Sequence, residues 1–418
     1  LAVRAAASKA VGEEVDKYLL VPPAVITQEF LVENGIADMD QLIEALPVLG
    51  ESPLVWPQWM LDLLARNGVE APAIAAESGA SDGSGIPELA AADVEIPAAF
   101  ASEEAPRVAL VRELGDGSFF ERYLAGAQSM ADELGIELIE SNARGDQAQM
   151  VTNIENAIQQ NVDAIIVDHG RTDTLQPAIE EALDADINVV TFDLVIDNPD
   201  VPEIEQDDML IGFLLSKQLA VDTAGNADVV YVNVNGFAPL DKRDRAWEDF
   251  KWRYPGLNEA IKIGRVTEST AADTQTQMEA AIKSNPEATT VIAMWDEFAK
   301  GAVRAIEQAG LGDQYRVYSV DITNEDIQMM TAEGSPWKAT VATDPYNVGR
   351  LAVRAAAAQI AGEEVDKYLL VPPAVITQEF LVENGITDMD QLIEALPVLG
   401  ESPLVWSDWM VALRDANQ

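Results

Sequence analysis

The sequence predicts an α/β protein with two doubly wound parallel-sheet lobes, and three observations lead to this prediction. From Arg107 onward, short apolar segments alternate with amphipathic stretches of helical length. Several of these stretches end at a glycine or just before a proline, as at Gly135 and Pro255. About ten strands are predicted, which is many for a single sheet, so two lobes with right-handed crossovers are favoured.

The individual elements follow from their residue patterns. Runs rich in valine and isoleucine predict strands, and apolar spacing of three to four residues predicts helices. The predicted strands are RVALV (107–111), IELIE (136–140), DAIIV (163–167), NVVTF (188–192), DVVYV (228–232), IKIGRV (261–266), TVIAM (290–294), RVYSV (316–320), KATVA (338–342) and AVITQ (374–378). The predicted helices are Phe119–Leu134, Gln147–Gln160, Thr174–Ala185, Leu210–Thr223, Arg243–Tyr254, Thr274–Lys283, Phe298–Ala309, Glu325–Glu333 and Tyr346–Ala361.

Composition excludes several kinds of partner and site. The chain has 418 residues and a net charge of −46, which disfavours nucleic acid and anionic membranes as partners. It contains no cysteine, which excludes disulfides, thiolate metal sites and cysteine nucleophiles. No run of 18 or more apolar residues occurs, so we expect no bilayer span. The chain begins with leucine and shows no signal-peptide pattern, so we expect a processed or cloned fragment.

An internal repeat joins the two ends of the chain. Residues 1–60 match 351–410, and only positions 8, 9, 10, 11, 37, 57 and 58 differ. We therefore expect 1–66 to be a remnant copy of the C-terminal segment, followed by an acidic linker at 67–106. A tandem binding protein whose first unit is absent from this chain is our preferred explanation. The alternative is a remnant that packs on the intact unit or exchanges with 351–410 of a neighbouring copy.

Carboxylates follow the predicted strands at the edge where such sheets bind ligands. These are Asp116, Asp168, Asp193, Asp296 and Asp321. Carboxylates accept hydrogen bonds from ligand hydroxyl groups. For each aspartate the alternative is a cap of the following helix.

Aromatic rings accompany these carboxylates. Phe119 and Phe120 begin a predicted helix, and Trp295 ends a predicted strand. Rings beside acceptor groups suit a ligand with apolar faces and a rim of hydroxyls, such as a monosaccharide or a polyol. For all three residues the alternative is packing in the core.

Two basic side chains are also candidates. Arg243 is predicted at the start of a helix in a very acidic chain, with a surface ion pair to Asp241 or Asp244 as the alternative. His169, the single histidine, follows Asp168 and is a candidate for the cleft, with a structural hydrogen-bonding role as the alternative.

From Arg107 to about Phe380 the sequence resembles the periplasmic sugar-binding proteins of the ribose/galactose type, the solute-binding proteins of ABC importers. The matching pieces are DGSFFERYLAGAQSMADELG, NVVTFD, RDRAWEDFKWRYPGL, MWDEFAKGAVRAIEQAGL, SVDITNEDI and KATVATDPYNVGRLAV. The resemblance implies two lobes joined by a three-stranded hinge that closes on a sugar. It also implies a periplasmic or extracytoplasmic location, with membrane anchoring possible through a missing N-terminal part, and permease and ATPase subunits as partners.

The resemblance assigns roles to particular residues. Phe119 and Phe120 match the aromatic pair that flanks the sugar ring, and Asp193 and Asp321 match carboxylates that accept its hydroxyls. Arg243 matches the arginine that donates to the sugar. Arg245 is a nearby competitor for this role.

Three positions depart from the ribose-type pattern. Leu194 replaces an arginine, Trp295 an asparagine, and Thr343 a hinge glutamine. Because two polar contacts are lost and an indole is gained, a pyranose such as glucose, galactose or xylose is favoured over ribose. A polyol or a small furanosyl-like signal molecule is the alternative.

The resemblance also implies the domain boundaries. Lobe 1 is expected at 107–207 plus 344–370, lobe 2 at 208–343 plus 371–386, and a C-terminal tail at 387–418. The galactose-type calcium loop is rejected, because Val189 and Val195 replace its glycine and final glutamate.

The function classes can then be compared. No nucleotide-binding or serine-hydrolase motif occurs, so we expect no enzyme activity, no catalytic residues, no cofactor and no metal. A repressor on this fold needs a basic N-terminal domain, whereas residues 1–106 are acidic. Delivery of a monosaccharide to an importer is favoured, with a receptor for chemotaxis or sensing as the alternative. A monomer is expected, with a swapped dimer as the alternative.

Overall fold

The computed structural model describes residues 36, 41–42, 94–102 and 104–417. Most of the predicted N-terminal remnant and most of the predicted linker lie outside these residues. No described helix is both long enough and apolar enough to cross a membrane.

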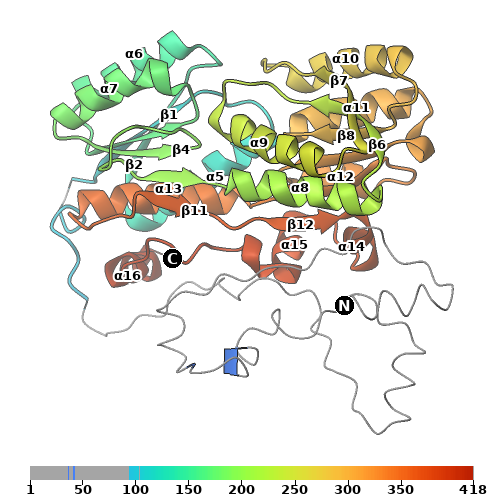
Figure 1. Cartoon of the computed structure of the whole chain (residues 1–418). Helices are drawn as coiled ribbons and strands as arrows, with labels where there is room; N and C mark the ends of the chain where they lie inside the picture. The colour runs from blue at the N-terminus through green and yellow to red at the C-terminus, as the bar shows by residue number, and fades with distance from the viewer. Residues whose placement is uncertain (1–35, 37–40, 43–93, 103, 418) are drawn as a thin grey trace, which may run out of the picture. The chain divides into compact units, whose positions relative to one another are not determined.

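The first lobe is built on a six-stranded parallel sheet with the strand order β11-β5-β4-β3-β1-β2 (Figure 1). Its strands are β1 (Arg107–Arg112), β2 (Glu137–Asn142), β3 (Ala164–Asp168), β4 (Asn188–Phe192), β5 (Glu203–Glu205) and β11 (Tyr368–Leu370). Its helices are α5 (Ser118–Leu134), α6 (Gln147–Gln159), α7 (Thr172–Asp184) and α13 (Pro345–Ile360). Side chains of β1 alternate between two cores: Val108 and Leu110 pack with α5 and α13, whereas Ala109 and Val111 pack with α6 and α7.

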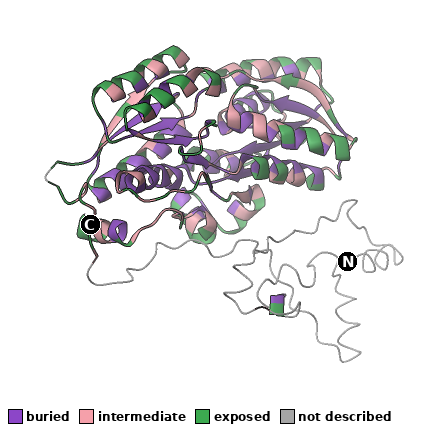
Figure 2. Cartoon of the chain, turned by 60° about the vertical axis from the view of Figure 1, so that its left-hand side comes forward, coloured by how far each residue is buried: buried purple, intermediate pink, exposed green. Residues whose placement is uncertain are grey.

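The second lobe has a six-stranded sheet with the order β12-β10-β9-β8-β6-β7, in which β12 alone runs antiparallel to its neighbour. Its strands are β6 (Ala227–Val232), β7 (Leu257–Ile263), β8 (Thr290–Ala293), β9 (Arg316–Val320), β10 (Trp337–Ala342) and β12 (Ala374–Thr377). Its helices are α8 (Asp208–Asp222), α9 (Ala238–Arg253), α10 (Thr270–Ser284), α11 (Asp296–Gln308), α12 (Asn324–Thr331), α14 (Gln378–Glu383) and α15 (Met389–Ala395), with the 3-10 helices η2 (Gly312–Gln314) and η3 (Pro397–Leu399). The central strands of both sheets are buried, whereas the edge strands β2, β7 and β11 are partly exposed, as are the outer faces of the helices (Figure 2).

The chain passes between the lobes three times, from β5 to α8, from β10 to α13 and from β11 to β12. The last helix, α16 (Asp408–Asn417), returns to the first lobe, where Trp409 and Met410 join the core of α5 and α13. The predicted fold class, two doubly wound parallel-sheet lobes joined by a hinge, is therefore confirmed.

Several details differ from the sequence-based expectation, and two of them bear on the site. The strands β5 and β11 were not predicted, because a strand of three residues carries no measurable periodicity. Helix α9 begins at Ala238, with a proline in its first turn, so Arg243 lies in the second turn instead of at the helix start.

Close packing of α5 against α13 fixes the start of α5 at the sheet edge. Gly126 of α5 touches the backbone of Tyr346, and Gly349 of α13 touches the backbone of Tyr123. A β-carbon at either glycine would overlap the facing carbonyl oxygen, so this approach requires glycine at both positions. The helix pair therefore holds Phe119 and Phe120 in a fixed position beside the strand ends.

Candidate functional site

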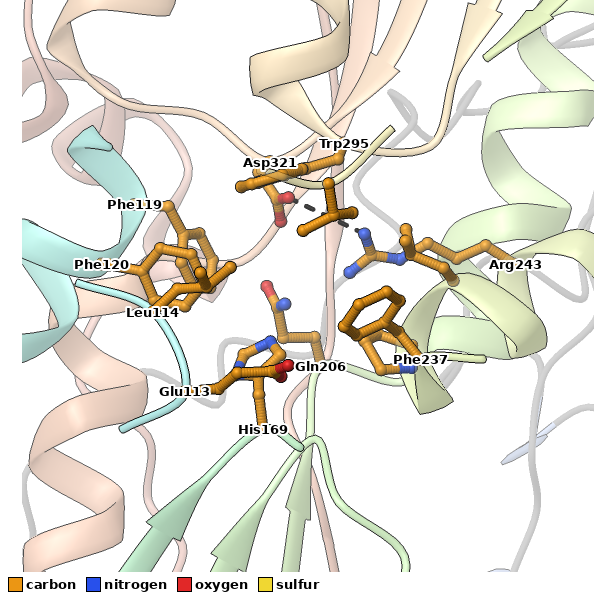
Figure 3. Close-up of a pocket in the computed structure, with 13 residues that line it drawn as sticks. Glu113, Leu114, Phe119, Phe120, His169, Gln206, Phe237, Arg243, Trp295 and Asp321 are labelled. Atoms are coloured by element: carbon orange, nitrogen blue, oxygen red, sulfur yellow. Dashed lines mark ion pairs between the residues drawn. The ribbon is translucent and has the colours of Figure 1, made fainter. Parts of the chain in front are cut away.

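A pocket lies where the strand ends of the two sheets face each other (Figure 3). The lining residues are Glu113, Leu114, Phe119, Phe120, His169, Gln206, Phe237, Pro239, Leu240, Arg243, Val266, Trp295 and Asp321.

Aromatic rings form one wall of the pocket. The ring of Phe119 stacks on Phe192 at 6.4 Å, which fixes its orientation against the sheet. The ring of Phe120 meets His169 edge-on at 5.4 Å and Trp295 edge-on at 6.2 Å. Because Phe120 belongs to the first lobe and Trp295 to the second, this wall spans both lobes.

The second lobe contributes a buried arginine and a carboxylate. Arg243 donates from Nε to Asp208 Oδ1 at 2.7 Å and from Nη1 to the Met294 carbonyl at 2.7 Å. Its Nη1 also lies 3.8 Å from Asp321 Oδ2, the ion pair marked in Figure 3. Burial raises the pKa of Asp321 to about 7, although the charge of Arg243 acts in the opposite direction.

Three strand-end residues adopt left-handed backbone angles. His169 after β3 has φ 62°, Asp193 after β4 has φ 50°, and Asp321 after β9 has φ 71°. Non-glycine residues rarely adopt these angles, and aspartate and histidine are among those that tolerate them best. Such local strain often clusters at ligand sites, and here it occurs at the ends of two neighbouring strands of the first sheet and one strand of the second.

His169 lies between carboxylates. Its Nδ1 is 2.5 Å from Asp168 Oδ1, and its Nε2 is 3.6 Å from Asp193 Oδ2. Burial lowers the pKa of His169, but Asp168, Asp193 and Glu113 outweigh burial and raise it to about 9. The imidazole is therefore cationic at neutral pH in this structure.

Residues outside the lining form hydrogen bonds that position the lining side chains. Asp168 accepts from Arg112 Nε at 3.4 Å, and Asp193 Oδ2 accepts from Gln206 Nε2 at 3.3 Å. Burial raises the pKa of Asp193 well above its usual value.

Several buried carboxylate oxygens at the site have no hydrogen-bond partner among the described residues. They are Glu113 Oε2, Asp193 Oδ1 and Asp321 Oδ1. A buried acceptor without a partner is costly, so these oxygens are suited to accept hydrogen bonds from a bound ligand.

The structure brings most of the predicted residues to one place. Phe119, Phe120, His169, Arg243, Trp295 and Asp321 line the pocket. Asp168, Asp193 and Thr343 do not line it, but each contacts a residue that does.

Two predicted residues lie elsewhere. Asp116 is exposed in the loop that follows β1 and does not line the pocket. Asp296 is fully buried and pairs with Lys300 Nζ at 2.9 Å, because its side chain turns along α11. Asp116, Asp296 and Asp321 do not cap the helices that follow them either. The cap positions of α5, α11 and α12 are occupied by Gly117, Trp295 and Thr323.

Sequence reasoning missed seven lining residues, of which only Glu113 carries a recognisable signal. Glu113 directly follows β1, but the sequence analysis selected Asp116, further along the loop, as the strand-end carboxylate. Gln206 follows the unpredicted strand β5, and Phe237 precedes a helix that begins earlier than predicted. The other four are Leu114, Pro239, Leu240 and Val266.

Within the described part of the chain, no group of three or more histidine or acidic side chains could hold a metal ion. The lining consists of aromatic and aliphatic side chains, the amide of Gln206, two carboxylates and the basic side chains of Arg243 and His169.

Known proteins share this architecture. Residues 108–364 match the family model described as periplasmic binding protein domain. The ribose import binding protein of Bacillus subtilis is 24% identical over 267 residues, which is 62% of this chain and 84% of that protein.

Solved structures extend the comparison. The 5-methylthioribose transporter solute binding protein from Thermotoga lettingae, in complex with 5-methylthioribose, is 66% identical with a TM-score of 0.75. The match covers 77% of this chain and 100% of that one. A sugar ABC transporter protein from Yersinia enterocolitica is 29% identical, with a TM-score of 0.76, and the match covers 78% of this chain and 100% of that one.

These matches confirm the resemblance to periplasmic sugar-binding proteins that the motifs indicated. The family model spans more than half of the sequence and includes both lobes. The chain therefore belongs to the periplasmic binding protein domain family.

Proposed function

We propose that this protein is an extracytoplasmic solute-binding protein that captures a pentose with an apolar substituent, of the 5-methylthioribose kind, for an ABC importer. The observation that carries the proposal is a pocket in which unpartnered buried carboxylate oxygens lie beside a largely apolar lining. The complex of the 66% identical Thermotoga lettingae protein with 5-methylthioribose supports this choice of ligand.

The polar part of the pocket suits the ring hydroxyls of a sugar. Asp321 and Glu113 have free acceptor oxygens, and Arg243 supplies a donor from the second lobe. Each hydroxyl donates one hydrogen bond and accepts others, so it can satisfy a carboxylate and a guanidinium together.

The apolar part suits a thioether group. Leu114, Leu240, Val266, Phe237 and the aromatic wall line the pocket. Sulfur contacts aromatic rings favourably, and a methylthio group needs no hydrogen-bond partner. A pyranose such as glucose carries a hydroxymethyl group, whose burial against these side chains without a partner is unfavourable. We therefore favour a substituted pentose over glucose and galactose, two of the pyranoses that the departures from the ribose-type pattern suggested.

The proposed mechanism is closure about the hinge. Phe119, Phe120 and His169 approach a ligand from the first lobe, while Arg243 and Asp321 approach it from the second. A ligand that contacts both lobes binds the closed state more tightly and shifts the population towards it. Binding is the proposed role in place of catalysis, and the permease and ATPase subunits of an importer are the proposed partners.

The proposal can be tested by fluorescence titration with 5-methylthioribose, ribose, xylose, glucose and galactose. We expect 5-methylthioribose to bind at least about tenfold more tightly than ribose, because burial of the methylthio group adds apolar contact. Trp295→Phe should remove the fluorescence change, whereas Trp252→Phe should keep it, because Trp252 is 80% exposed and lies outside the pocket. Tighter binding of glucose or galactose, or no binding of any of these sugars, would contradict the proposal.

A further inference from the structure

A contact between the lobes lies outside the residues that line the pocket. Ser118 is the first residue of α5 in the first lobe. Its Oγ is 2.8 Å from Nζ of Lys300 on α11 and 3.0 Å from Oγ1 of Thr323, the cap residue of α12. Ser118, Lys300 and Thr323 are absent from the pocket lining, so we do not expect a ligand in the pocket to touch them.

The direction of each hydrogen bond follows from the chemistry of the groups. Lys300 can only donate, so it donates to Ser118 Oγ. Thr323 uses its hydroxyl hydrogen to donate to Asp326 Oδ2 at 2.8 Å. Ser118 must therefore donate to Thr323, and each hydroxyl in the series both accepts and donates one hydrogen bond.

The lysine that begins this series is held in place by the second lobe. Lys300 is 1% exposed, and its Nζ also donates to Asp296 Oδ2 at 2.9 Å and to Glu297 Oε1 at 2.8 Å. Together with the bond to Ser118, these bonds use all three hydrogens of the Lys300 ammonium group. Burial lowers the pKa of Lys300, but the surrounding carboxylates outweigh burial and raise it, so the donor to Ser118 is charged.

We infer that Ser118, Lys300 and Thr323 form a latch that stabilises the closed arrangement of the lobes and sets ligand affinity without contributing to ligand selectivity. When the lobes separate, Lys300 and Thr323 keep their carboxylate partners in the second lobe, and only the two bonds of Ser118 are lost. The apparent affinity depends on the fraction of molecules in the binding-competent state, so the latch acts on every ligand equally. The expected effect of the latch on ligand affinity rests on the proposed function, whereas its expected effect on the distance between the lobes does not.

The lobe arrangement can be measured on the full chain without ligand. The protein contains no cysteine, so spin labels can be attached at Glu155→Cys on α6 and Ala280→Cys on α10, both exposed. Ser118→Ala should shift the distance distribution between the labels towards longer distances. Ser129→Ala is the matched control, because Ser129 also lies on α5 and accepts from a cation, Arg350 at 3.0 Å, and both of its hydrogen bonds are to residues of α13 and α5 in the first lobe.

Affinity supplies the second measurement. Ser118→Ala should raise the Kd about tenfold, the effect of losing a charge-assisted bond, by the same factor for 5-methylthioribose and for ribose. Thr323→Val should add little to Ser118→Ala, because the two hydroxyls act through one another. Label distances and Kd values equal to those of the unsubstituted protein, or factors that differ between ligands, would overturn the inference. If neither sugar binds, the proposed function fails and the label distances alone decide on the latch.

Discussion

Thr343 Oγ1 donates a hydrogen bond of 2.7 Å to Gln206 Oε1, and this bond joins two of the three chain crossings between the lobes. Gln206 precedes α8 in the first crossing, and Thr343 follows β10 in the second. Ribose-type proteins were expected to carry a glutamine at the position of Thr343. Here the amide comes from Gln206, which lines the pocket and donates to Asp193.

The first prediction concerns Gln206. Gln206→Leu should raise the Kd for the sugar by about tenfold to a hundredfold, because Asp193 loses a donor and the pocket loses its amide. Isothermal titration calorimetry measures this change. Gln149→Leu, on the exposed face of α6, is the control and should leave the Kd unchanged. An unaltered Kd in Gln206→Leu would show that the amide serves only the hinge.

The second prediction concerns Asp321, whose buried Oδ1 has no hydrogen-bond partner within the part of the chain that the structure describes. Asp321→Asn keeps the size of the side chain but replaces an acceptor oxygen with a donor and weakens the charge opposite Arg243. We expect the Kd to rise at least about a hundredfold, with a melting temperature within a few degrees of the unsubstituted protein. Calorimetric titration and thermal unfolding together test this expectation. Asp116→Asn is the control, since Asp116 is exposed and outside the pocket.

These two residues also show what the sequence could and could not predict. Asp321 follows a clear strand, RVYSV, so its place at the sheet edge was predictable from the strand pattern alone. Gln206 follows a three-residue strand whose pairing with β4 and β11 exists only in the folded sheet. Its partners are distant in the sequence, and Thr343 comes 137 residues later. A contact of this kind depends on tertiary structure, and local patterns carry no information about it.

Asp116 and Glu113 illustrate a second limit. Both follow the first predicted strand, and the choice between them depends on where β1 ends and how the loop turns. β1 ends at Arg112, so Glu113 is buried at the strand end, while Asp116 is carried to the surface. A difference of three residues in this loop determines whether a carboxylate lines the pocket or is exposed to solvent. The boundaries of helices and strands are the least predictable feature of a sequence.

The third prediction is a pH dependence caused by His169. Its pKa is raised from 6.5 to about 9 in the folded protein, so the native state holds a proton that the unfolded state releases. The resulting stabilisation is fully present below about pH 6.5 and is lost as the pH rises through about 9. The loss should amount to up to about 3 kcal/mol of unfolding free energy.

Urea unfolding between pH 6 and pH 10 measures this dependence. His169→Asn is the appropriate variant, because asparagine tolerates the left-handed backbone at this position. The difference between the two proteins isolates His169 from Asp321, whose pKa of about 7 also makes stability fall as the pH rises from about 4. A pH dependence that is the same in both proteins would refute the assignment.

The last prediction concerns the packing of α5 on α13, which positions Phe119 and Phe120. Gly126→Ala adds a methyl group that would overlap the Tyr346 carbonyl oxygen, so the helices must move apart. Alanine favours a helix over glycine by about 1 kcal/mol, which opposes the effect of overpacking. The facing atoms belong to the backbone, which cannot move aside as a flexible side chain can. We therefore expect the cost of overpacking to exceed the gain in helix propensity, so that the unfolding free energy falls by about 1–3 kcal/mol. Ala125→Ser, at the exposed neighbouring position, also adds one heavy atom and should change stability by less than about 0.5 kcal/mol in urea unfolding. If Gly126→Ala were as stable as Ala125→Ser, the two helices would not pack as closely as the structure places them.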